Sequence, residues 1–187
     1  MKTRDIDLRT SLNSFLIDKF SYDKTTRIVH ELNVCYGSAR ADVAAINGLL
    51  HGYEIKSESD TLERLPQQME QYNKVFDNMT IVCCDNFISQ AEKLIPKWWG
   101  IYIASYNDSQ IIELDIYRKP EKNDNVDAFS ISQFLQKAEI IQILIELGAD
   151  KKISRLPKYV LWEELSKNCP LDLLKDYVRF ILKHRNN

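Results

Sequence analysis

The spacing of hydrophobic residues divides the first 118 residues into helices and strands. Apolar side chains recur at helical spacing over residues 5–20 and 66–77, which predicts two amphipathic helices, and a third is expected over 87–95. Apolar runs typical of strands lie at 27–36, 39–46, 49–57, 79–85, 99–105 and 111–118. The predicted order is therefore α-β-β-β-α-β-α-β-β, which indicates an α/β protein.

The pattern changes after residue 118. Residues 119–130 are polar and are expected to form a connector. A helix should follow, capped by Ser130 with Gln133 three residues on, as in a capping box, and ended by Gly148. Two more helices are expected to begin at prolines, which suit the first helical position; these are Pro157 and Pro170. We thus predict a core over 1–118, a connector over 119–130 and a helical subdomain over 131–187.

Charge is unevenly distributed along the chain. The net charge is −2, but residues 1–150 hold 16 Lys and Arg against 23 Asp and Glu, whereas residues 151–187 hold 9 against 4. A basic tail on an acidic body is compatible with phosphate contacts by the tail. The tail can equally be a solvated helix face. Its basic residues Lys151, Lys152, Arg155 and Lys158 lie between two predicted helices, as in a helix-turn-helix reader or in a packing subdomain.

Cysteine usage and hydropathy indicate the compartment. The four cysteines show no metal-ligand spacing, and Cys83 and Cys84 lie in an apolar run as small buried side chains do. A reducing cytoplasm fits this usage best. The chain has no apolar run of membrane-spanning length and no secretory signal at its start, so we expect no membrane partner.

Charged residues interrupt three of the apolar strands. Glu54 and Lys56 share one face of their strand because side chains alternate with period two. Asp42 lies in an alanine-rich strand just before, and the Asn47-Gly48 turn folds the two strands together. Glu31 is a third carboxylate in an apolar strand. Unpaired charges in such strands are costly, so these positions predict a functional site.

Converging carboxylates of this kind repel one another unless a cation lies between them. Mg²⁺ prefers oxygen ligands, and a neighbouring lysine stabilises developing negative charge or orients a water molecule. Together these groups indicate metal-assisted hydrolysis of phosphodiesters.

The motif E-x(10)-D-x(11)-E-x-K, formed by Glu31, Asp42, Glu54 and Lys56, resembles the PD-(D/E)XK superfamily of restriction-endonuclease-like nucleases. The resemblance extends to small bacterial and phage members with a helical C-terminal portion. It implies a restriction-endonuclease-like αβββαβ core with a mixed central sheet flanked by helices, followed by a C-terminal helical extension.

The resemblance also implies roles for these residues. Asp42, Glu54 and the backbone carbonyl of Ile55 would bind Mg²⁺ or Mn²⁺, with Glu31 as a further acid. Asp42, Glu54 and Lys56 would form the catalytic set. Ala41 stands where the motif has proline, a departure that the superfamily tolerates widely.

Substrate contacts are expected from four further residues. Gln68 and Tyr72 resemble the Q-x-x-x-Y motif of exonuclease branches. Arg64 and Arg40 flank the predicted site and would contact phosphates. Three of them have a structural alternative: Tyr72 lies on the core face of its helix, Gln68 would cap a loop, and Arg40 would be an exposed edge charge.

The sequence thus predicts a cytoplasmic, Mg²⁺- or Mn²⁺-dependent nuclease that acts on nucleic acid, with DNA favoured over RNA, and that is either a homodimer or bound to a protein partner. The alternative is a catalytically silent nuclease-fold protein that binds nucleic acid or a protein in defence, counter-defence or repair. A toxin or an inhibitor of host defence is a third reading of the same residues.

Overall fold

The computed structural model describes residues 3–185 and shows an α/β protein with six strands and seven α-helices in that range. The strands are β1 (Arg27–Val34), β2 (Ala39–Ile46), β3 (Leu50–Lys56), β4 (Asn78–Cys84), β5 (Gly100–Tyr106) and β6 (Ile112–Arg118). The α-helices are α1 (Asp5–Lys19), α2 (Leu65–Val75), α3 (Ile88–Leu94), α4 (Ala128–Ser132), α5 (Lys137–Glu146), α6 (Lys158–Asn168) and α7 (Leu171–His184). Short 3₁₀ turns are η1 (Cys35–Gly37), η2 (Asp85–Phe87) and η3 (Lys151–Arg155).

The six strands form one mixed sheet in sequence order, β1-β2-β3-β4-β5-β6. Pairs β1–β2, β2–β3 and β5–β6 are antiparallel, and β3–β4 and β4–β5 are parallel. The parallel pairs need crossover connections, which α2 and α3 supply. Both β3 and β4 are buried along their whole length, as expected for central strands covered on both faces.

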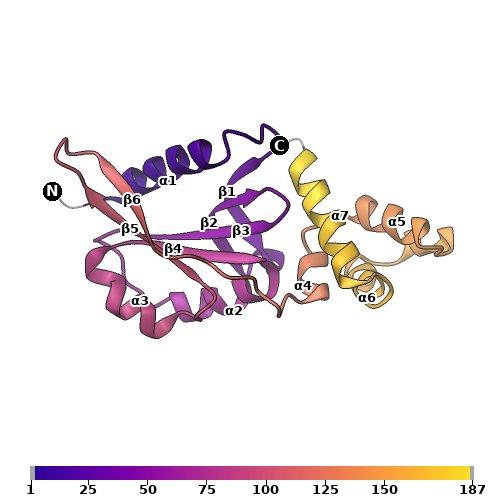
Figure 1. Ribbon diagram of the computed structural model, residues 1–187. Helices are drawn as coiled ribbons and strands as arrows, with labels where there is room; N and C mark the ends of the chain where they lie inside the picture. Colours follow the sequence, from indigo (N-terminus) through magenta and orange to yellow (C-terminus); the bar gives the residue numbers. More distant parts are fainter. Residues whose placement is uncertain (1–2, 186–187) are drawn as a thin grey trace.

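Helices cover the two faces of the sheet (Figure 1). Helix α1 packs on one face through the stripe of Leu8, Leu12 and Leu16, against a core that includes Tyr53 and Tyr102. Helices α2 and α3 cover the other face, and their core is continuous with that of the C-terminal helices. Helices α4 to α7 gather beyond the β1–β2 end of the sheet.

The α/β prediction and the order of the core elements are confirmed. A restriction-endonuclease-like core is not confirmed. The division into a core, a connector and a helical subdomain stays a prediction. None of the helices among the described residues has both the length and the apolar character needed to cross a bilayer.

The first C-terminal helix was wrongly predicted. The chain forms two helices there, α4 and α5, where the sequence indicated one beginning at Ser130. Asp127 is the N-cap of α4, because its carboxylate accepts a hydrogen bond from the Ser130 N–H at 2.7 Å. A second N-terminus follows, where Glu139 accepts from the Gln136 N–H at 2.6 Å. Two N-caps nine residues apart therefore start two separate helices, and α4 ends before the second of them.

Candidate functional site

A polar cavity of about 590 Å³ opens where β1, β2 and β3 meet the N-terminal parts of α1 and α2. Its charged lining residues are the bases Arg9, Arg40, Lys56 and Arg64 and the acids Asp5, Glu31, Asp42, Glu54 and Asp60. The antiparallel β2–β3 hairpin places the Asp42 strand beside the Glu54 strand, as the Asn47-Gly48 turn predicts. The cavity therefore brings the residues of the sequence motif together.

Asp42 is held from two sides. Its Oδ2 atom accepts a hydrogen bond from the Ile55 N–H at 2.8 Å, and its Oδ1 atom pairs with Arg9 Nη2 at 2.9 Å. The Arg9 Nη1 atom also donates to the Asp42 carbonyl at 2.9 Å. Arg9 thus binds both the side chain and the main chain of one β2 residue, which fixes α1 against the sheet.

Glu54 is buried among three donors. Its Oε1 atom pairs with Lys56 Nζ at 2.7 Å and accepts from Gln68 Nε2 at 2.8 Å. The Tyr72 hydroxyl donates to its Oε2 atom at 2.8 Å. The same hydroxyl lies 2.7 Å from the Arg40 carbonyl oxygen. Helix α2 therefore places Gln68 and Tyr72 beside Glu54. Both side chains were expected to contact a substrate, and in the structure they donate hydrogen bonds to the Glu54 carboxylate.

Glu31 lies at the rim of the polar cavity and is 41% exposed at its side chain. Its Oε1 atom pairs with Arg9 Nη1 at 3.0 Å and its Oε2 atom with Arg40 Nε at 2.6 Å. The backbone of Glu31 has φ 57° in the middle of β1, a left-handed conformation that is uncommon for residues other than glycine.

Burial raises the pKa values of both inner carboxyl groups. For Asp42 the burial effect exceeds the opposing effects of the Ile55 N–H and the Arg9 charge. For Glu54 burial and the neighbouring Asp42 charge raise the pKa against the effect of Lys56. Burial and the adjacent Glu54 charge likewise raise the pKa of Tyr72. These shifts show that the two carboxyl groups interact inside a poorly solvated site.

Four of the five acids of this cavity, Asp5, Glu31, Asp42 and Glu54, pair with side-chain cations, whereas Asp60 accepts hydrogen bonds from Ser57. Among residues 3–185 no group of three or more His, Cys, Asp and Glu side chains is placed to hold a metal ion. Arg9 occupies the space between acids, contacting Asp5 at 3.4 Å as well as Glu31 and Asp42. A Mg²⁺ or Mn²⁺ ion at Asp42, Glu54 and the Ile55 carbonyl stays a prediction, and it requires displacement of Arg9 and Lys56.

Arg9 and Asp5 are the site residues that the sequence reasoning missed. They form an i,i+4 pair at the start of α1, a spacing that places side chains on one helix face. Arg9 directly follows Leu8, the first residue of the buried stripe. The sequence could have indicated Arg9 in one way: it is a basic residue at the margin of a buried apolar stripe, with an acidic residue one helical turn earlier.

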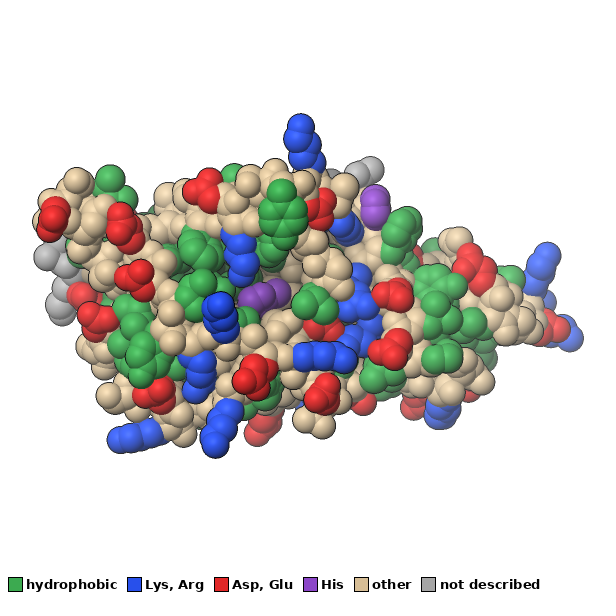
Figure 2. Space-filling view, in the orientation of Figure 1, with side chains coloured by type: hydrophobic (Ala, Val, Ile, Leu, Met, Phe, Trp, Pro, Cys, Tyr) green, Lys and Arg blue, Asp and Glu red, His purple; other side chains and the backbone are tan. Residues whose placement is uncertain are grey.

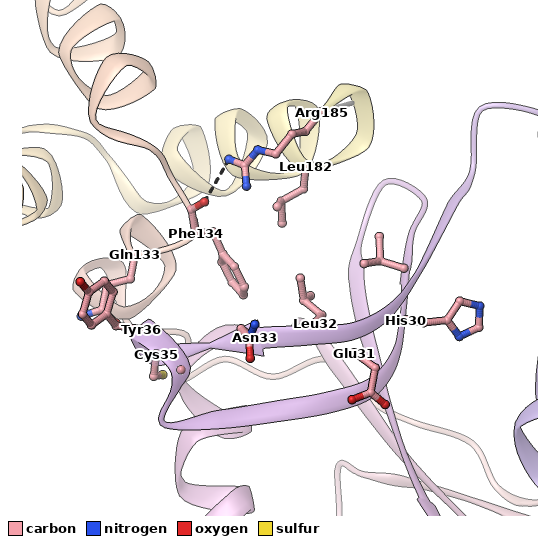
Figure 3. Close-up of a pocket in the computed structure, with 12 residues that line it drawn as sticks. His30, Glu31, Leu32, Asn33, Cys35, Tyr36, Gln133, Phe134, Leu182 and Arg185 are labelled. Atoms are coloured by element: carbon pink, nitrogen blue, oxygen red, sulfur yellow. Dashed lines mark hydrogen bonds between the residues drawn. The ribbon is translucent and has the colours of Figure 1, made fainter. Parts of the chain in front are cut away.

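A second cavity of about 590 Å³ lies between β1 and the C-terminal helices. Figure 3 shows Leu32, Phe134 and Leu182 converging on it from the strand, from the segment after α4 and from α7. Arg185 closes one side, donating to the Phe134 carbonyl at 3.0 Å and pairing with Glu139 at 2.7 Å. Apolar contacts and the polar contacts of Arg185 together attach the C-terminal helices to the edge of the sheet.

The fold and the polar cavity define a mixed α/β protein with an ion-paired cavity at one end of its sheet. The sequence matches the family described as Bacteriophage P4 protein cII over residues 3–187, and the chain belongs to that family. Protein cII of Enterobacteria phage P4 is 29% identical over 182 residues, which are 97% of this chain and 67% of the relative.

A solved structure is also similar in part. It is the SPO1766 protein of unknown function from Silicibacter pomeroyi, which is 20% identical, with a TM-score of 0.44 over 64% of this chain and 75% of that one.

Family membership corrects the prediction of function. The assignment to the PD-(D/E)XK superfamily is wrong, because the matching family is that of phage P4 protein cII. The predicted metal-dependent nuclease activity, with its hydrolase and endonuclease descriptions, is wrong for the same reason. So is the alternative of a silent nuclease-fold protein. The physical reason lies in the pairing of the motif residues. Spacing in sequence correctly indicated that Asp42, Glu54 and Lys56 converge, but convergence alone does not distinguish a reaction centre from an ion-pair network.

Proposed function

We propose that this protein binds nucleic acid through a basic corner, defined as Lys151, Lys152, Arg155 and Lys158 on η3 and the start of α6. The single observation that supports the proposal most strongly is that these four cations lack acidic partners: within residues 3–185, the structure forms no ion pair with any of them. Lys151, Lys152 and Arg155 are exposed. Unpaired clustered cations are the feature by which proteins attract a phosphate backbone.

The basic corner is a cluster of cations on a surface of mixed charge. On the face seen in Figure 2, basic and acidic side chains are interspersed over the body of the molecule, and Lys and Arg side chains project at the helical end with an acidic side chain among them. The acid nearest in sequence, Asp150, caps η3, because its carboxylate accepts from the Lys152 N–H at 2.7 Å. The hydrogen bond that caps η3 therefore also fixes the backbone from which Lys151 and Lys152 project.

Two aromatic side chains, Trp162 and Tyr36, lie between the basic corner and the polar cavity. The Lys158 ammonium lies 4.9 Å from the centre of the Trp162 ring, and Trp162 meets Tyr36 edge to face at 5.2 Å between centroids. Tyr36 is 76% exposed. Gly37, its neighbour, lines the polar cavity, at whose rim lie Arg40 and Arg64. Trp162 is buried, and the exposed Tyr36 ring suits stacking with a base.

The prediction of DNA over RNA rested on the nuclease resemblance, so both nucleic acids belong in the test. We also propose that the protein acts in the cytoplasm, because its four cysteines are free thiols. A homodimer or a protein partner stays a proposal, with β6 as a sheet edge at which main-chain pairing could occur.

The test is fluorescence anisotropy with labelled single-stranded DNA, duplex DNA and RNA. The variant Lys151→Gln/Lys152→Gln/Arg155→Gln should bind the preferred nucleic acid about tenfold or more weakly, because up to three phosphate contacts are lost. The matched control Lys93→Gln/Lys97→Gln/Lys119→Gln removes the same charge from exposed positions elsewhere and should bind like the wild type. Equal weakening in both variants would show only a general charge effect and would refute the basic corner.

A further inference from the structure

The Glu31 carboxylate lies between two guanidinium groups from different elements. Arg9 on α1 holds one oxygen at 3.0 Å, and Arg40 on β2 holds the other at 2.6 Å. Figure 3 shows Glu31 directed to the opposite side of β1 from Phe134 and Leu182. A small anion therefore has two convergent donors at the rim of the polar cavity, and the chain itself supplies that anion.

The backbone of Glu31 is strained in this position. Its φ of 57° departs from strand geometry, although its neighbours remain in register, with His30 opposite Val43 and Leu32 opposite Ala41. A non-glycine residue held in the left-handed region costs free energy and marks sites where strain serves a function. With Glu31 and Arg40 at 41% and 62% exposure, the ion pairs that retain the carboxylate are also of the weak, solvent-screened kind.

Arg9 is positioned before any ligand arrives. The Asp42 side chain, the Asp42 carbonyl and Asp5 all hold its guanidinium, so little side-chain freedom remains to be lost on binding. Planar guanidinium groups match the oxygens of phosphate as well as those of carboxylate. With Glu31 withdrawn, the cavity is lined by four basic and four acidic side chains, so an incoming anion no longer meets an excess of acidic side chains in the lining.

We propose that Arg9 and Arg40 form a binding site for a phosphate-class anion, and that the Glu31 carboxylate occupies this site in the free protein. The anion is either a free phosphate or an esterified one. If the protein binds nucleic acid as proposed above, a backbone phosphate is the natural ligand, but the anion site does not depend on the basic corner.

The test compares the wild type with Glu31→Gln, which keeps the shape of the side chain and removes the competing charge. Calorimetric titration with inorganic phosphate and pyrophosphate at low ionic strength probes free anions. Anisotropy with an oligonucleotide lacking terminal phosphates probes esterified ones. We expect Glu31→Gln to bind at least one class about tenfold more tightly, because the two ion pairs of Glu31 no longer have to be exchanged.

Two further variants separate this effect from general charge. Glu70→Gln removes one negative charge from an exposed position on α2 and should bind like the wild type. Glu31→Gln/Arg40→Gln should lose the gain. Tighter binding of pyrophosphate assigns the site to free anions, and tighter binding of the oligonucleotide alone assigns it to phosphodiesters.

The proposal is overturned if Glu31→Gln binds every probe no more tightly than the wild type, or if the double variant keeps the gain. The nucleic-acid proposal fails separately, through the basic-corner variant.

Discussion

Side chains in the polar cavity neutralise one another, and the pair Lys56–Glu54 is the most deeply buried example. The two side chains are 8% and 2% exposed and lie 2.7 Å apart. A buried ion pair is not a strong source of net stability, but the removal of one partner leaves an unpaired charge in a poorly solvated site. The cost of breaking the pair is therefore much larger than the benefit of having it.

We predict that Lys56→Met lowers the free energy of unfolding at pH 7 by about 3–5 kcal/mol, because Glu54 loses its cation. Urea denaturation measures this change. The double variant Glu54→Gln/Lys56→Met, which leaves no charge behind, should recover a large part of the loss. A Lys56→Met protein as stable as the wild type would contradict the burial of this pair.

His51 is the residue whose titration should govern acid stability. It lies on β3, with Nε2 2.8 Å from the Thr80 hydroxyl and Nδ1 3.1 Å from the Tyr53 hydroxyl. Burial lowers its pKa from 6.5 to about 3. The folded protein therefore keeps His51 neutral at pH values where the unfolded chain binds a proton.

We predict that the stability contributed by neutral His51, present above pH 6.5, is lost as the pH falls from 6.5 towards about 3, at up to about 1.4 kcal/mol per pH unit. Denaturation at a series of pH values should show a shallower decline for His51→Gln. The exposed His30 provides the control, since His30→Gln should keep the wild-type slope. The raised pKa values of Asp42 and Glu54 act in the opposite direction but are common to all three proteins. An unchanged slope in His51→Gln would refute this assignment.

At the scale of elements, one carboxylate links the last helix to the sheet. Asp77, between α2 and β4, is 2% exposed and pairs with Lys175 at 2.5 Å and with Arg179 at 3.0 Å, both on α7. It also accepts from the Leu50 N–H at 2.8 Å. Asp77 therefore joins the start of β3 to α7, whose Arg179 lies 102 residues after Asp77 in the chain.

We predict that Asp77→Asn lowers the free energy of unfolding by about 3–5 kcal/mol, because Lys175 loses its acidic partner and Arg179 loses the buried one of its two partners. Asp176→Asn removes the exposed partner of Arg179 and should change stability by less than about 1 kcal/mol. Thermal and urea denaturation of the two variants measure the difference. Equal effects would show that α7 is held by its apolar contacts alone.

The elements with strong periodicity were predictable from the sequence. The nine elements from α1 to β6 follow from the alternation and helical spacing of their apolar residues, and their convergence at Asp42 and Glu54 follows from the Asn47-Gly48 hairpin. The break between α4 and α5 was not predicted, because apolar residues continue at helical spacing through Ile131, Phe134 and Leu135 and conceal it. The N-caps at Asp127 and Gln136 set where the two helices begin. In a sequence, a capping residue is a weaker signal of a helix boundary than the periodicity of apolar residues is of a continuous helix.

The function of the polar cavity was not predictable in the same way. Sequence spacing indicates which carboxylates lie close together. It does not indicate which cation pairs with them, because that cation can come from a distant part of the chain. Here it is Arg9, from a helix that crosses the β2 strand 33 residues away in sequence. The left-handed backbone at Glu31 has no sequence signal either, since nothing in a Val-His-Glu-Leu run indicates it.

At the scale of the whole molecule, charge separates two regions. Residues 1–150 carry an excess of acid and form an ion-paired cavity, whereas residues 151–187 carry 9 basic residues against 4 acidic ones. An acidic body repels a polyanion outside the contact surface and so orients the approach. We expect the helical end to meet the nucleic acid, with the Arg9–Arg40 pair at the far end of the contact.

The most direct test of nucleic-acid binding by the basic corner is the salt dependence of that binding. Dissociation constants measured between about 50 and 200 mM salt give a slope that reports the number of phosphates neutralised. We predict that Lys151→Gln/Lys152→Gln/Arg155→Gln reduces this slope by about 2–3 relative to the wild type, since each lost phosphate contact accounts for about 0.7–0.9. A slope that is the same in both proteins, or no binding by the wild type at the lowest salt concentration, would contradict the proposed function.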